Sequence, residues 1–228
     1  MNRMKFCSLL TALVVALALL AGCGSETAME QPAPDAGKAE APADRDFGKL
    51  KGKKIMVAYY SRADENTGVG VIEKGNTEIL AERIAEDLGA DIYKIEPEKP
   101  YPKDYKEATD VAKEEKAKNA RPAVKGEIPD LSGYDVIFLG YPIWWGDLPM
   151  TVYTFLEHES FRGKIIVPFC THEGSGIGST PETIVQLTRP LGLLPPLEMR
   201  GTKAQKERDE AKAEVDNWLE GLGKDDSL

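Results

Sequence analysis

Two adjacent tryptophans, Trp144 and Trp145, have the clearest capacity for ligand chemistry in this sequence. They lie in the segment GYPIWWGDLP, residues 140–149, between a proline and a glycine. A helix would bury tryptophans at helical spacing, and a strand would direct neighbouring side chains to opposite faces. On a loop, where Pro142 and Gly146 set the turns, the two indoles offer flat faces that suit stacking against an aromatic ring. One of the two could instead serve only in the core or in an interface.

The segment SRADENTGVGVIEKGNTE, residues 61–78, joins an apolar run to the predicted start of a helix. The free N–H groups at the start of a helix attract phosphate. Ser61, Asn76 and Thr77 could add short hydrogen-bond donors, and Gly75 would let the backbone approach a ligand closely. The pattern therefore indicates a phosphate site, although Asn76 or Thr77 could be no more than the N-cap of the helix.

A third loop, THEGSGIGS at residues 171–179, offers backbone N–H groups, small hydroxyls and little bulk. Such a loop could bind the polar edge of a heterocycle. It imitates a dinucleotide fingerprint, but that fingerprint would need a glycine where Ser179 stands, and it belongs after the first strand of a fold. His172 could titrate beside a ligand, or it could hydrogen-bond only to the backbone of its own loop.

The elements that position these loops alternate regularly between strand and helix. Apolar, β-favouring runs predict strands, and apolar residues at helical spacing predict helices. Alternation of this kind implies a parallel sheet with helices on both faces, and the simplest order for five strands is 2-1-3-4-5. In that order a ligand is expected beyond the carboxyl ends of the first and third strands. The predicted strands are residues 54–61, 91–97, 134–142, 164–171 and 193–200, and the predicted helices are 76–89, 105–120, 150–158, 181–188 and a C-terminal helix with Trp218 in the core.

Composition narrows the classes of partner. The chain has 228 residues and a formal net charge of −9, which argues against nucleic acid as a ligand. Its cysteines and histidines lack zinc-like spacing, so no metal site is expected. Of the three cysteines only Cys170 falls within the predicted domain, at the end of a buried strand where packing predicts an inert thiol.

The N-terminal residues carry targeting signals. Two basic residues precede an apolar run of signal-peptide length that ends in LAGC, a pattern that resembles a bacterial lipoprotein signal. We therefore expect a signal peptide at residues 1–22, a lipidated Cys23 that anchors the exported chain to the bacterial membrane on its extracytoplasmic side, and a flexible linker at 23–46. An ordinary secretory signal or an uncleaved anchor is the alternative. The domain is expected at 47–222 and a disordered tail at 223–228.

The combination of YYSR…KGNTE, IFLGYPIWWGDLP and PFCTHEGSGIGS resembles the flavodoxin family, and especially short bacterial flavodoxin-like domains with a YPIWWG loop. The resemblance implies a three-layer α/β/α sandwich and non-covalently bound FMN. Residues 63–74 are inserted relative to the compact phosphate loop of the family. The resemblance implies phosphate binding by Ser61, Arg62, Gly75, Asn76 and Thr77, flanking of the isoalloxazine by Pro142, Ile143, Trp144, Trp145 and Gly146, and contact with its pyrimidine edge by Thr171, His172, Glu173, Gly174, Ser175 and Gly176.

Three functions are compatible with these features. The first is an electron carrier whose FMN exchanges electrons with a redox partner protein or a small quinone-like acceptor. The second is an FMN-dependent NAD(P)H or quinone reductase. The third is a binding domain that keeps the fold but has lost FMN. The three loop motifs disfavour the third function, and fold alone cannot separate the first two.

Overall fold

The computed structural model describes residues 47–226 and residue 228. The predicted signal peptide at 1–22, the predicted lipidation site Cys23 and the predicted linker at 23–46 therefore lie outside the described residues. Within the described part, no helix is both long and apolar enough to cross a membrane.

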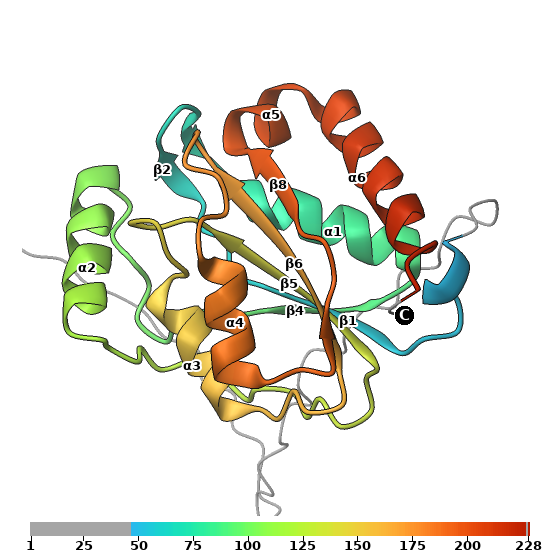
Figure 1. The fold of residues 1–228 in the computed structure, drawn as a ribbon. Coiled ribbons are helices and arrows are strands. Elements are labelled where there is room, and N and C mark those ends of the chain that lie inside the picture. Colours follow the sequence, from blue (N-terminus) through green and yellow to red (C-terminus); the bar gives the residue numbers. More distant parts are fainter. Residues whose placement is uncertain (1–46, 227) are drawn as a thin grey trace, which may run out of the picture. The chain divides into compact units, whose positions relative to one another are not determined.

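A parallel sheet forms the centre of the domain, and Figure 1 shows it between its helices. The strand order is β4-β1-β5-β6-β7, and β8 also pairs with β6. This is the order 2-1-3-4-5 expected from the sequence, with the fifth strand in two pieces. The strands are β1 (Ile55–Tyr59), β4 (Asp91–Lys94), β5 (Val136–Pro142), β6 (Ile165–His172), β7 (Gly192–Leu193) and β8 (Leu197–Arg200).

The expectation of one continuous strand at residues 193–200 is wrong. Leu194 N still donates to Ile166 O at 3.0 Å, but the next two residues are Pro195 and Pro196. Proline has no backbone N–H and cannot donate to the ladder. The pairing therefore stops after β7 and resumes at Leu197, which gives the sheet six strands in place of five.

Both faces of the sheet are buried, because alternate residues of β1 enter two separate apolar clusters. Val57 and Tyr59 belong to the cluster under α1, α5 and α6, whereas Met56 and Ala58 belong to the cluster under α3 and α4. Figure 1 shows these helices on the two sides of the sheet, as the α/β/α prediction requires. The helices are α1 (Asn76–Leu88), α3 (Met150–His158), α4 (Thr180–Thr188), α5 (Gly201–Lys206) and α6 (Arg208–Leu222).

Two further features depart from the predicted elements. Part of the inserted segment 63–74 forms an antiparallel hairpin of β2 (Asp64–Asn66) and β3 (Gly70–Ile72). The C-terminal helix is broken at Glu207, where φ is −124° and ψ is 56°, and α6 begins after it. Trp218 of α6 is partly buried and meets Phe138 edge-on, with ring centroids 5.7 Å apart, so its predicted packing on the core is present.

The two ends of the described domain meet. Lys49 follows the start of the short 3₁₀ helix η1 (Gly48–Leu50), and its N donates to Gly223 O at 2.9 Å. Its Nζ lies 2.6 Å from Asp226 Oδ1. The segment predicted as a tail therefore contacts the beginning of the domain in its described residues.

Candidate functional site

A cavity of about 240 Å³ lies beyond the carboxyl ends of β1, β5 and β6. The strand order reverses here, so this is where the topology predicts a ligand. We call one side of the cavity the sheet-side wall and the other the helix-side wall, and Trp145 stands between them. The sheet-side wall comprises Asn76, Pro142, Ile143, Trp144, Thr171, His172 and Glu173; the helix-side wall comprises Arg62, Asn66 and Thr67 together with Tyr105, Ala108, Thr109 and Ala112 of α2 (Tyr105–Ala117).

The residues predicted for the site divide into two groups. All three predicted loops reach the cavity, which supports the expectation that they act together. Those that line it are Arg62, Asn76, Pro142, Ile143, Trp144, Trp145, Thr171, His172 and Glu173. The predicted residues that do not line the cavity are Ser61, Gly75, Thr77, Gly146, Gly174, Ser175 and Gly176.

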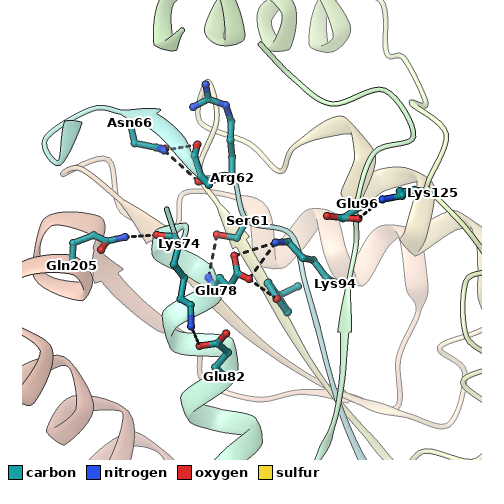
Figure 2. Close-up of polar contacts among 12 residues, drawn as sticks. Ser61, Arg62, Asn66, Lys74, Glu78, Glu82, Lys94, Glu96, Lys125 and Gln205 are labelled. Atoms are coloured by element: carbon teal, nitrogen blue, oxygen red, sulfur yellow. Dashed lines mark hydrogen bonds and ion pairs between the residues drawn. The ribbon is translucent and has the colours of Figure 1, made fainter. Parts of the chain in front are cut away.

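Ser61 caps α1 from the end of the neighbouring strand. Its Oγ accepts a hydrogen bond from Glu78 N at 3.1 Å, as Figure 2 shows, and the N-cap position itself is Gly75. The alternative in which Asn76 or Thr77 caps this helix is therefore wrong. Gly75 is required by the close approach of two segments, because a Cβ there would lie 2.2 Å from Ser61 Oγ and 2.6 Å from Arg62 O.

Two side chains in the first turn of α1 face the sheet and the cavity. Thr77 is buried, and its Oγ1 lies 2.8 Å from Thr171 Oγ1, so this hydroxyl pair fixes α1 to β6. Asn76 Oδ1 is also buried and has no hydrogen-bond partner within the described residues. A buried acceptor without a donor is unfavourable. Asn76 is therefore suited to a bound hydroxyl or amide.

The charge of Glu78 at the start of α1 is balanced by its neighbours. Lys94 Nζ lies 3.1 Å from Glu78 Oε2, and Tyr59 Oη donates to Glu78 Oε1 at 3.3 Å; Figure 2 shows Lys94 and Glu78 facing each other. Burial, and secondly the Glu78 carboxylate, raise the pKa of the Tyr59 phenol, which keeps it a donor. Lys94 thus offsets a negative charge that would otherwise oppose an anion at this helix terminus.

Arg62 ties the hairpin β2–β3 to the chain that leads into α2. Its Nη2 donates to Pro102 O at 2.5 Å and to Lys103 O at 2.7 Å, and its Nη1 donates to Glu65 O at 2.5 Å. On the other side, Asn66 Nδ2 donates to Arg62 O at 3.2 Å, as Figure 2 shows. The backbone carbonyls of Glu65, Pro102 and Lys103 already accept hydrogen bonds from Nη1 and Nη2 of Arg62. Arg62 therefore contributes positive charge and a rigidly held side chain to the cavity more than free donors.

The double-tryptophan segment is a tight two-residue turn. Trp144 N donates to Asp147 O at 2.9 Å, and Asp147 N donates to Trp144 O at 3.0 Å. The two central residues both have positive φ, 53° at Trp145 and 71° at Gly146, which is the pattern of a type I′ turn. This conformation is ordinary for glycine but costs of order 1 kcal/mol for a bulky residue such as Trp145.

The two tryptophans have different surroundings. Trp144 is partly buried and meets two tyrosines edge-on, with ring centroids 5.3 Å from Tyr60 and 4.9 Å from Tyr101. Trp145 is 50% exposed, and its Nε1 donates to Thr109 O of α2 at 3.0 Å. Trp144 therefore belongs to the apolar cluster beneath the cavity, whereas Trp145 joins the turn to α2.

Helix α2 is held over the cavity by polar side chains. Lys116 Nζ donates to Trp145 O at 2.8 Å and lies 3.2 Å from Asp147 Oδ2. Tyr101 Oη donates to Glu115 Oε2 at 2.5 Å, and burial raises the pKa of the Glu115 carboxyl. Figure 1 shows α2 standing apart from the sheet, and these contacts explain how it keeps that position.

The loop after β6 is held by a hydrogen bond within the loop and by a hydrogen bond to the start of α5. His172 Nδ1 accepts from Gly174 N at 2.9 Å, which is the backbone-bonding role that the sequence left open for this histidine. Glu173 Oε1 accepts from Thr202 N at 2.7 Å. The hydroxyl of the predicted residue Ser175 is used within the loop, because Ser175 Oγ donates to Gly176 O at 3.2 Å.

Comparison with known proteins agrees with this architecture. Residues 54–222 match the family model described as Flavodoxin. The chain belongs to the flavodoxin family. A proposed flavoprotein of Bacteroides eggerthii DSM 20697, solved at 1.40 Å, is 30% identical, with a TM-score of 0.59 over 76% of this chain and 99% of the other. A proposed flavoprotein of Bacteroides uniformis ATCC 8492 is 27% identical, with a TM-score of 0.56 over 74% and 99%. Comparison with curated proteins gave no significant match.

Sequence reasoning missed most of the helix-side wall of this flavodoxin. Asn66 and Thr67 lie in the inserted hairpin, and the others lie on a helix whose composition is mainly polar. A signal was present, because Ala108 and Ala112 form a thin apolar stripe too narrow to cover a sheet. The missed lining residues are Asn66, Thr67, Tyr105, Ala108, Thr109 and Ala112.

Proposed function

We propose that this flavodoxin binds FMN non-covalently in the cavity and acts as an electron carrier for a redox partner protein or a small quinone-like acceptor. The observation that carries the proposal is the convergence of three loops on one cavity at the reversal of strand order. Bound FMN would supply the capacity to accept and donate electrons, while the protein would bind and orient it.

The residues present fit the parts of FMN. Asn76 Oδ1 lacks a donor that a ribityl hydroxyl could supply. The start of α1 offers backbone N–H groups to the phosphate, with Lys94 offsetting the charge of Glu78. Trp144 and Trp145 offer aromatic surfaces to the ring system, and Thr171 and His172 line the same cavity and could meet its polar edge.

The first test is the absorbance spectrum of the full chain, purified in detergent without added flavin and again after addition of FMN. We expect an oxidised-flavin spectrum and release of FMN, not FAD, on denaturation. Absence of flavin, together with unchanged tryptophan fluorescence on addition of FMN, would overturn the proposal. Saturable oxidation of NADH with a quinone acceptor would instead identify a reductase.

We also propose that the domain is exported and anchored to the bacterial membrane through lipid on Cys23, which stands in the motif LAGC. Several acyl chains on one residue would hold the domain firmly at the membrane surface. Incorporation of a fatty-acid label in the wild type but not in Cys23→Ala is the expected result. Equal labelling of both chains, or none, would contradict anchoring at this residue.

A further inference from the structure

Helix α2 turns its apolar side toward the cavity. Ala108 and Ala112 are 3% and 6% exposed, and both line the cavity. Neither belongs to the two apolar clusters that cover the faces of the sheet. The face of α2 that a flavodoxin-like helix would press against a sheet therefore forms a boundary of the ligand space.

Contacts at two places hold this face in position. Near the end of α2, Lys116 Nζ donates to Trp145 O at 2.8 Å and pairs with Asp147. At its start, Glu65 Oε2 of the hairpin accepts from Tyr105 N at 2.9 Å. The wall is thus tied to the double-tryptophan turn at one end and to β2 at the other.

We propose that α2 is the second wall of the flavin site, and that Ala108 and Ala112 restrict its occupant to a single planar ring system. This inference rests on the proposed function and adds the residues that determine what the site admits. A cavity of about 240 Å³ is smaller than the roughly 300–1,000 Å³ typical of small-molecule pockets. A planar ring bound there would meet α2 on one side and the sheet-side wall on the other.

The proposal defines the class of reaction partner. Hydride transfer from a nicotinamide requires that its ring come into van der Waals contact with the flavin ring. With α2 held in place, a flavin ring bound between the two walls would have both faces covered, so we expect no second ring to stack on it. The two walls would therefore exclude stacked hydride donors, and an electron acceptor would have to approach a bound flavin from outside the cavity.

The test uses matched alanine-to-leucine changes on α2. Ala112→Leu would place its isobutyl group in the cavity, whereas Ala117→Leu makes the same change at an exposed position of the same helix. Affinities for FMN and for lumiflavin, which has the ring but no phosphate, would be measured by quenching of flavin fluorescence. We expect Ala112→Leu to weaken both affinities at least tenfold, and Ala117→Leu to leave both within twofold of wild type.

The outcomes separate the inference from the function on which it rests. If the wild-type chain binds no FMN, the proposed function fails. If it binds FMN and Ala112→Leu binds equally well, the inference alone fails. Circular dichroism would establish that the variant is folded, and Ala108→Leu provides a second position. Independently of any variant, NADH should reduce bound FMN no faster than free FMN, and a faster, saturable reduction would overturn the exclusion of stacked donors.

Discussion

The sheet-side wall and the helix-side wall of the cavity are held by different kinds of contact. On the sheet side, Thr77 and Thr171 are buried and bonded to each other, and Cys170, which precedes Thr171 in β6 and faces the opposite side of the sheet, is 0% exposed. On the helix side, α2 is held by Lys116, whose side chain is 40% exposed, and by hydrogen bonds to carbonyl oxygens. The first wall is an extension of the core, and the second is attached to it mainly by exposed contacts, besides the part-buried hydrogen bond from Tyr101 to Glu115.

The difference has an energetic consequence. Buried groups that lose a partner cost about 1–3 kcal/mol, whereas exposed ion pairs contribute about 0–1 kcal/mol. The position of the sheet-side wall should therefore resist changes of salt and of single surface residues. The helix-side wall should respond to both by opening more often, while its closed position still bounds the cavity.

The largest effect is expected for the reactivity of the Cys170 thiol. This reactivity tests whether solvent and reagents can reach the end of β6 in the folded protein. Burial, and secondly the charge of Glu198, raise the pKa of the Cys170 thiol to about 12. At pH 8 its thiolate fraction should be roughly a thousandfold below that of an ordinary thiol of pKa about 8.5. Native protein should therefore resist iodoacetamide at this residue, and protein unfolded in urea should react.

Labelling is measured as the difference between wild type and Cys170→Ala, so that other cysteines do not contribute. Because the thiol pKa is raised in the folded state, its contribution to stability is present below about pH 8.5 and is lost as the pH rises toward 12. Rapid labelling of native Cys170 at pH 8 would show that the end of β6 is more open than the described contacts allow.

The second effect is expected at Gly75, where two segments of the chain pass close to each other on the sheet side. In Gly75→Ala, the new Cβ would lie 2.6 Å from Arg62 O, a backbone atom that cannot move independently. We expect a loss of about 1–3 kcal/mol in unfolding free energy, typical of overpacking. Displacement of the start of α1 should also weaken FMN binding about a hundredfold, equivalent to about 2.7 kcal/mol.

Gly133→Ala is the control, because a Cβ at Gly133 has nothing within 4 Å. Urea unfolding and fluorescence titration with FMN would be compared for the two variants. An FMN affinity in Gly75→Ala within threefold of wild type would contradict the assignment of this corner of the cavity to the phosphate.

The contrast between the walls also explains what the sequence could predict. The apolar runs of β5 and β6 and the helical spacing in α1 are local patterns, and the rule for parallel sheets then places the ligand at their carboxyl ends. The sheet-side wall follows from these patterns because it is the edge of the core.

The helix-side wall depends on contacts that no local pattern encodes. The hairpin β2–β3 has short strands and an 82% exposed Val71, so it lacks the alternation that identifies a strand. The apolar stripe of α2 predicts a covered face but not what covers it. Likewise, Ser61 caps a helix of which it is not part, and Trp145 adopts a positive φ that residue preferences disfavour.

The smallest effect is expected at Lys116, and it sharpens the comparison most directly. Lys116→Met keeps most of the aliphatic chain but removes the ammonium group that bonds Trp145 O and pairs with Asp147. Global stability should fall by less than about 1 kcal/mol, as for other exposed ion pairs. Amide hydrogen exchange in α2 should nevertheless accelerate severalfold, while exchange in α1 stays unchanged, because local opening follows local contacts. Salt at about 0.5 M should likewise accelerate exchange in wild-type α2, because it screens the ion pair.

Lys118→Met is the matched control, since Lys118 pairs only with Glu114 of α2 among the described contacts and does not contact the double-tryptophan turn. A loss of more than about 2 kcal/mol in Lys116→Met, or equal acceleration in α1 and α2, would mean that the helix-side wall is as much a part of the core as the sheet-side wall.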